Sequence, residues 1–181
     1  MGRGRTAVYG LDIETDTSTD GLDPSRSAVL TVALSLPGAD EVYIGVEWEI
    51  LVDLDARLRD LEPGVLATWN GATFDLPFLA DRAELWGLRL GLVLRPDHDT
   101  RVHGPLLHGH AGGYRAAWHH HDHVDAYRLY RNDETDLSIE AQHAHPSSDA
   151  RLARVLTERR WATACRLVDR LGPAAGSSSV A

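Results

Sequence analysis

The first third of the chain alternates between apolar runs and polar breaks. Residues 6–13, 28–36 and 41–46 are β-branched, aromatic or apolar and contain no proline, so each run predicts a strand. Residues 16–27 are rich in Asp, Ser, Thr and Gly and predict a loop, and residues 37–40 predict a tight turn. Because the connections are short, we expect the three strands to form an antiparallel meander.

The apolar period then lengthens from that of a strand to that of a helix. Leucines recur at helical spacing within residues 50–61, at Leu51, Leu54, Leu58 and Leu61. The pair Pro63 and Gly64 ends this predicted helix. Residues 65–69 form a short apolar run that predicts a buried strand. Because it follows a helix, we expect it to lie parallel to the first strand.

A turn and a second helix follow that strand. Residues 70–73 predict the turn, and residues 74–86 predict a helix that tolerates Pro77 in its first turn and stops at Gly87. Residues 95–122 are rich in glycine and histidine and predict a long irregular excursion. A loop of this length in a compact domain is usually functional or mobile.

The last third is less regular until its final helix. Residues 124–130 predict a strand or a strand that passes into a helix, and residues 132–145 are polar without a clear period. Residues 146–171 predict the longest helix of the chain, which Gly172 and Pro173 end. We therefore expect residues 1–172 to form a single domain and residues 173–181 to form a flexible tail.

The predicted order of elements is three strands, a helix, a strand, a helix, a strand and a helix. This order predicts an α/β fold with a mixed sheet, in which three antiparallel strands are extended by parallel strands and flanked by helices. The layout resembles that of the ribonuclease H-like fold. Function must still be argued from the residues of a site.

The charge of the chain limits its partners. It has 27 acidic and 18 basic residues, for a net charge of −9, so it does not coat nucleic acid through bulk positive charge. Any contact with nucleic acid must be local or bridged by metal. All basic residues are arginine, which excludes a Walker A lysine, a Schiff-base lysine and a lysine general base.

Cysteine count and hydropathy set the expected compartment. The single cysteine, Cys165, permits no intrachain disulfide and no cysteine-based zinc cluster. No apolar run approaches the ~20 residues that span a membrane, and no signal-peptide apolar region follows the start. We therefore expect a cytoplasmic protein without a membrane partner.

Two carboxylates one residue apart end the first predicted strand. Asp12 and Glu14 should point to the same face, roughly 7 Å apart, while Ile13 faces the other way. Two like charges side by side are unfavourable unless a cation lies between them, and hard oxygen ligands suit Mg²⁺ or Mn²⁺. The alternative is a pair of solvated acids at a strand end.

A third carboxylate follows the fourth predicted strand. Asp75 lies at the start of a helix, where the helix dipole favours a negative charge, so an ordinary N-terminal charge is one interpretation. If the first and fourth strands are neighbours, Asp75 instead falls beside Asp12 and Glu14. Its surroundings favour this second interpretation.

Two motifs resemble one family. WNGATFDLPFL (residues 69–79) resembles the second motif of the DEDD (DnaQ-like) superfamily of 3′–5′ exonucleases, closest to the proofreading-domain type of family B DNA polymerases. In that motif Asn and a short gap precede Phe-Asp, and Pro and an apolar residue follow. GLDIET (residues 10–15) is similar to the first motif, Asp-x-Glu-Thr. The resemblance covers about residues 6–171.

The resemblance implies a fourth carboxylate in the last helix. The match is Asp149, with His145 four residues before it in place of the Tyr that this spacing has in the family. Residues four apart on a helix share a face, but Pro146 makes His145 a residue at the helix start. His145 is therefore either a candidate general base or a surface histidine.

The resemblance implies phosphodiester hydrolysis with two divalent ions, Mg²⁺ or Mn²⁺. Asp12 would bridge both ions, Glu14 and Asp149 would complete one of them, and Asp75 would hold the other. A neutral imidazole at His145 would orient or deprotonate the attacking water.

The resemblance also implies contacts with nucleic acid. The candidate residues are Thr15, Leu22, Asn70, Phe74 and Asp125. Leu22 and Phe74 would contact the terminal base, and Asn70 a sugar or phosphate. Asp125 could also be a structural residue or a substitute ligand.

The run of histidines at residues 119–123 permits a zinc site, because alternate residues on a strand share a face. No fourth ligand is evident, and we favour plain solvent exposure for these side chains.

The sequence leaves two functions open. The favoured one is a metal-dependent 3′–5′ exonuclease that acts on single-stranded or 3′-terminal nucleic acid, with DNA favoured over RNA. The alternative is a degenerate member that binds nucleic acid or protein without turnover, which the His-for-Tyr exchange and the short span between Asp125 and Asp149 favour.

Overall fold

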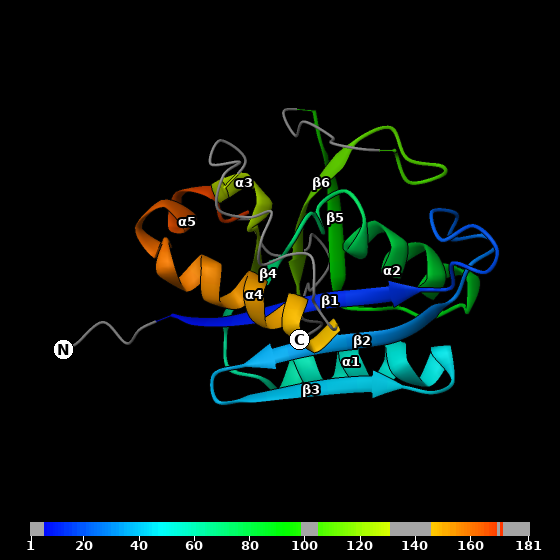
Figure 1. Cartoon of the computed structure of the whole chain (residues 1–181), viewed down its shortest axis with the longest axis horizontal. Coiled ribbons are helices and arrows are strands. Elements are labelled where there is room, and N and C mark those ends of the chain that lie inside the picture. Colours follow the sequence, from blue (N-terminus) through cyan, green and yellow to red (C-terminus); the bar gives the residue numbers. More distant parts are fainter. Residues whose placement is uncertain (1–5, 99–104, 131–145, 170, 172–181) are drawn as a thin grey trace, which may run out of the picture.

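The computed structural model describes residues 6–98, 105–130, 146–169 and 171. Within them a seven-stranded mixed sheet has the strand order β3-β2-β1-β4-β7-β6-β5. The strands are β1 (Ala7–Thr15), β2 (Val29–Leu36), β3 (Ala39–Ile44), β4 (Gly64–Thr68), β5 (Leu92–Asp97), β6 (Gly113–Trp118) and β7 (His121–Asp125). The helices are α1 (Glu47–Asp60), α2 (Asp75–Leu85), α3 (Tyr127–Tyr130), α4 (Pro146–Arg159) and α5 (Trp161–Leu167). Figure 1 shows their arrangement.

The pairing of the strands confirms the predicted fold class. β2 is antiparallel to β1 and to β3, which makes the meander, and β4 is parallel to both β1 and β7. Three antiparallel strands are thus extended by parallel ones. The crossovers between the parallel strands carry helices, as parallel connections require.

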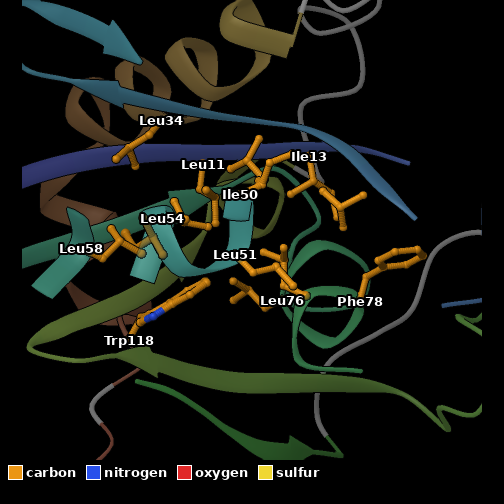
Figure 2. Packing of buried hydrophobic residues seen from close by; sticks show 14 of the residues in the cluster. Leu11, Ile13, Leu34, Ile50, Leu51, Leu54, Leu58, Leu76, Phe78 and Trp118 are labelled. Carbon is orange, nitrogen blue, oxygen red and sulfur yellow. The ribbon is translucent and has the colours of Figure 1, made fainter. Parts of the chain in front are cut away.

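Two apolar layers cover the two faces of the sheet. Tyr9, Leu11 and Ile13 alternate along β1 and enter the main core, where the leucines of α1 pack against them (Figure 2). Val8, which precedes Tyr9 and faces the other way, enters the second core, which includes Ala153 of α4. In Figure 1 α4 lies across β1 and β2. No helix in the described part of the chain is long and apolar enough to cross a membrane.

The predicted irregular excursion over residues 95–122 is wrong at both of its ends, which belong to strands. β5 and β6 form an antiparallel pair at the edge of the sheet, and residues 119–120 make the turn into β7. The pairing places Arg95 opposite Arg115 and Pro96 opposite Tyr114. Proline is tolerated here because β5 is an edge strand. The polar residues at these positions interrupt the apolar alternation that would predict a strand.

The predicted helix over residues 146–171 is in fact two helices. The break falls at Arg160, whose backbone leaves the helical region at φ −109° and ψ 30°. Its guanidinium donates to the carbonyl oxygen of Leu129 at 3.0 Å and lies 4.1 Å over the ring of Tyr130. These contacts fix the turn between α4 and α5 against α3.

Candidate active site

Asp12 and Glu14 occupy one face of β1. In the register with β2 they lie opposite Ala33 and Thr31, while Ile13 between them is buried in the main core. Asp12 is half-buried and Glu14 is exposed. The alternation of the strand therefore presents both carboxylates toward the face that α4 crosses.

Asp75 lies at the first residue of α2 and is buried. Its Oδ1 accepts a hydrogen bond from the backbone N–H of Ile13 at 3.2 Å. This bond joins the start of α2 to β1 at the residue between Asp12 and Glu14. The parallel pairing of β1 with β4 makes the contact possible, because α2 begins shortly after the end of β4.

Asp149 lies in the first turn of α4. This helix meets β1 at Gly10, where a Cβ atom would lie 1.8 Å from the carbonyl oxygen of Ala150. Only glycine allows the two backbones to approach so closely. The contact brings the N-terminal turn of α4 to the strand that carries the acid pair.

The pKa values show that the four carboxylates interact. Burial, together with repulsion from Asp75, Asp149 and Glu14, raises the pKa of Asp12 to about 9. Burial also raises the pKa of Asp75 to about 7, with repulsion from Asp125 and Glu14. The pKa of Asp149 rises through burial and the charge of Glu14. Three acids from three elements thus have raised pKa values at one place, and Glu14 acts on each of them by repulsion.

The donor chemistry of this cluster fits a hard divalent cation. Clustered carboxylate oxygens are ligands that Mg²⁺ and Mn²⁺ prefer, and a cation would relieve the mutual repulsion. In the described residues no group of three or more His, Cys, Asp or Glu side chains is arranged as a formed metal site. The argument that a divalent cation fits this cluster therefore rests on the negative charge of the carboxylates and on their oxygen donors.

Asp125 supports the turn that leads to Asp75. It is buried, and its Oδ1 accepts hydrogen bonds from the backbone N–H groups of Asn70 at 2.9 Å and Tyr127 at 3.0 Å. Its Oδ2 accepts from the N–H of Ala72 at 3.3 Å. Both carboxylate oxygens are bound to the protein backbone. Asp125 therefore supports the turn, and its predicted contact with nucleic acid does not match this position.

Asn70 adopts a left-handed backbone conformation in that turn, at φ 63°. Its side-chain Oδ1 accepts a hydrogen bond from the hydroxyl of Thr73 at 2.8 Å. Phe74 is half-buried and packs on Phe78, with 5.5 Å between the ring centroids. The two predicted contact residues of the second motif therefore lie on one short turn.

The remaining predicted contacts, Thr15 and Leu22, lie at the end of β1 and in the loop after it. The hydroxyl of Thr15 donates to the carbonyl oxygen of Gly21 at 3.1 Å, and Leu22 is 37% exposed. The loop is fixed by Arg82, which donates to the carbonyl oxygen of Pro24 at 2.8 Å. His145, the candidate base, lies outside the described residues.

The residue that anchors Arg82 could not be predicted from the sequence. Glu47, at the start of α1, is buried and binds Arg82 at 2.5 Å. It also accepts hydrogen bonds from the N–H of Val29 at 2.7 Å and from the indole of Trp86 at 2.7 Å. The partners are far apart in the chain, so no local pattern identifies them.

The predicted solvent exposure of the histidine run is wrong for three of its members. His121 and His123 are buried, and His119 is half-buried. Nε2 of His119 lies 3.0 Å from Oδ1 of the buried Asp55, and Nε2 of His121 donates to the carbonyl oxygen of Leu58 at 2.6 Å. These histidines bind α1 to the β6–β7 turn.

Comparison with known proteins gives a family match over most of the chain. The family described as "DNA polymerase family B, exonuclease domain" matches residues 10–138. DNA polymerase 2 of Aeropyrum pernix is 25% identical over 107 residues, which are 57% of this chain and 13% of that protein. A DNA polymerase of Thermococcus aggregans is 29% identical over 110 residues, which are 60% of this chain and 6% of that protein.

A solved structure matches the fold. The family B DNA polymerase from Pyrobaculum calidifontis superposes with a TM-score of 0.55 at 22% identity, over 77% of this chain and 17% of that one. The chain spans 13% or less of the length of these curated relatives. Because the family match extends over well more than half of its residues, the chain belongs to the exonuclease-domain family of family B DNA polymerases.

Proposed function

We propose that this chain is a metal-dependent 3′–5′ exonuclease that hydrolyses phosphodiester bonds at the 3′ ends of DNA. The observation that carries the proposal is the convergence of four carboxylates, in which burial and repulsion raise the pKa values of Asp12, Asp75 and Asp149 and Glu14 contributes repulsion. Such perturbed acids cluster at functional sites, because a fold keeps them together only at a cost in stability. Family membership and the DNA polymerases among the relatives support DNA as the substrate.

The four carboxylates would hold two Mg²⁺ or Mn²⁺ ions. Asp12, Glu14 and Asp149 would hold one ion, and Asp12 and Asp75 would hold the other. When bound, the ions would activate a water nucleophile and balance the charge of the phosphate and of the leaving oxygen.

The protein's own groups would orient the carboxylates. The N–H of Ile13 holds Asp75 toward β1, and the burial of Asp12 raises the cost of leaving it ionised without a cation. Gly10 lets α4 bring Asp149 to the same strand. His145 remains the proposed residue that would accept the proton of the attacking water.

The contacts with nucleic acid would come from the turn and the loop beside the carboxylates. Phe74 and Leu22 would contact the terminal base, and Asn70 would contact a sugar or phosphate. Thr15, at the end of β1, would also contact the DNA. Asp125 would act by holding Asn70 and Ala72 in place.

The test is degradation of a single-stranded and a 3′-recessed DNA oligonucleotide, labelled at the 5′ end, with Mg²⁺ or Mn²⁺. The proposal predicts a ladder of products shortened from the 3′ end, which needs metal and vanishes in the Asp12→Ala/Glu14→Ala double variant. Folded wild-type protein that gives no ladder with either metal would contradict the proposal and favour a binding module without turnover. His145→Ala then tests the base.

A further inference from the structure

The two edges of the sheet differ in how they are protected against pairing with another chain. β5 forms one edge and carries Arg95 and Pro96, and a proline cannot donate a hydrogen bond to an added strand. β3 forms the other edge, and its sequence, ADEVYI, contains no proline and no basic residue (Figure 1). In the part of the chain that the structure describes, β3 pairs only with β2. The backbone on its outer side can therefore accept a further strand.

A groove lies where this edge meets α1. It encloses about 220 Å³, and its lining includes Tyr43, Val46 and Ile50 together with two acids of α1, Glu49 and Asp53. Tyr43 and Ile50 also pack against the main core, so the groove has an apolar floor. An extended segment that lay here could pair with β3 and cover this floor at the same time.

The two acids of the groove are exposed and have no ion-pair partner among the described residues. Glu41 on β3, by contrast, binds Arg57 at 2.8 Å. Glu49 and Asp53 lie four residues apart on α1, a spacing at which like charges repel each other. Basic groups bound in the groove would relieve that repulsion.

The side chains of β3 alternate between the two faces of the sheet. Tyr43 faces the main core and α1, whereas Val42 and Ile44 face the other way and are 48% and 74% exposed. An added strand alternates in the same way. Its side chains on the α1 face would meet Glu49 and Asp53, and those on the other face would lie beside Val42 and Ile44.

We propose that the outer edge of β3 binds an extended segment of a partner protein in which basic and apolar residues alternate. Main-chain hydrogen bonds to β3 would give affinity, and the acids of the groove and the apolar pair would select the side chains. The inference does not rest on the proposed function, because it uses none of the candidate site residues.

The charges of the edge disfavour two other occupants. A second copy of this chain would bring a net charge of −9 and an acidic β3 to an acidic groove. A nucleic acid would bring phosphates beside Glu49 and Asp53, which repel them. A basic and apolar segment has neither disadvantage.

The first measurement is binding of a fluorescein-labelled octapeptide that alternates arginine and valine, followed by anisotropy. Wild type should bind it, and Glu49→Gln/Asp53→Asn should weaken binding about fivefold, as expected for the loss of two exposed ion pairs. Val42→Ser/Ile44→Ser should also weaken binding about fivefold, because it removes apolar area that the valines would cover.

Two controls separate pairing from general attraction to an acidic protein. Asp60→Asn/Glu62→Gln removes the same charge from exposed positions at and just beyond the other end of α1, and it should bind within about twofold of wild type. A peptide of the same composition, with all arginines before all valines, should bind at least about fivefold more weakly than the alternating peptide.

The second measurement is amide hydrogen exchange with and without the alternating peptide. The peptide should slow exchange within β3 and leave the other edge strand, β5, unchanged. Wild type that does not bind the peptide, or binding that is equal in wild type and in both β3-edge variants, would overturn the proposal. Slower exchange in another segment with no change in β3 would overturn it as well.

Two further results would assign the edge to a different occupant and so contradict the proposal. One is a wild-type dimer, seen by sedimentation, that Ile44→Arg dissociates, because it would give the edge to a second copy of the chain. The other is protection of β3 by octathymidylate and not by the peptide, which would give the edge to nucleic acid.

Discussion

At the scale of single residues, the candidate site is a set of acids whose ionised forms are disfavoured by burial and by mutual repulsion. Asp12 is the most affected, because its carboxylate loses solvation and is repelled by Asp75, Asp149 and Glu14 together. The raised pKa is a statement about stability as well as chemistry, since the folded chain holds a proton that the unfolded chain releases.

Asp12→Asn should therefore stabilise the metal-free protein at alkaline pH. The pKa of Asp12 is about 9 in the folded state and about 4 in the unfolded state. Between these values the folded state binds more protons, so the free energy of unfolding falls as pH rises. The variant lacks this penalty, and its thermal unfolding midpoint in EDTA should exceed that of wild type at pH 8 and converge with it near pH 4.

Saturating Mn²⁺ should reverse the order at pH 8. The ion binds the native carboxylates and stabilises wild type by mass action, and it binds the variant less. The prediction for EDTA has its own contradicting result. If the thermal unfolding midpoints of wild type and Asp12→Asn change in parallel with pH, ionisation of Asp12 does not destabilise the folded protein.

The sequence predicted residues whose signal is local and missed residues whose partners are distant. Asp12, Glu14 and Asp75 lie in short motifs, so the sequence alone predicts each of them as a site residue. Asp55 is also buried, and it accepts a hydrogen bond from the indole of Trp118, 63 positions away, at 2.8 Å. A lone polar residue in a leucine-rich helix looks like part of a solvated face until its partner is known.

At the scale of elements, the site depends on the crossing of α4 over β1. Gly10 is the contact point, and its missing side chain sets the distance between the helix and the strand. Any side chain there would push the first turns of α4 outward, and Asp149 would move with them.

Gly10→Ala should destabilise the protein by about 3 kcal/mol, which is the range for overpacking a rigid contact. The added methyl group would lie 1.8 Å from the carbonyl oxygen of Ala150. The matched control is Gly112→Ala, because a Cβ at that glycine has no neighbouring atom within 4 Å. Urea denaturation measures both, and equal midpoints for the two variants would refute the close approach of helix and strand.

Elements with a steady period were predicted, and elements with interruptions were not. β1 to β4, α1 and α2 follow the apolar pattern closely. β5 and β6 were missed because Arg95 faces Arg115 across an edge pair, so the strands show little apolar alternation. The break between α4 and α5 was missed because it depends on the contacts of Arg160 with α3.

At the scale of the whole molecule, Asp169, which lies just after α5, closes the sheet. β6 pairs with β7 only at their shared turn, and Asp169 joins the two strands beyond it. Its N–H donates to the carbonyl oxygen of His123 at 2.7 Å, and its Oδ2 accepts from the N–H of Ala116 at 3.2 Å. Oδ2 also lies 3.2 Å from Nδ1 of His123.

Asp169→Ala should destabilise the protein by about 3 kcal/mol, because it leaves buried donors on β6 and β7 without an acceptor. Asp169→Asn keeps one oxygen acceptor and should recover part of that loss. Urea denaturation gives the free energy of unfolding for each variant. If the alanine variant is as stable as wild type, Asp169 does not close the sheet.

We propose that Asp12, Glu14, Asp75 and Asp149 form one site for divalent metal. The most direct test is titration of Mn²⁺ into metal-free protein by isothermal calorimetry, for wild type and for the Asn variants of Asp12, Asp75 and Asp149. We expect two ions per wild-type chain and at least about a tenfold loss of affinity in every variant. Absence of Mn²⁺ binding to folded wild type, or affinities that are equal in all four proteins, would contradict it.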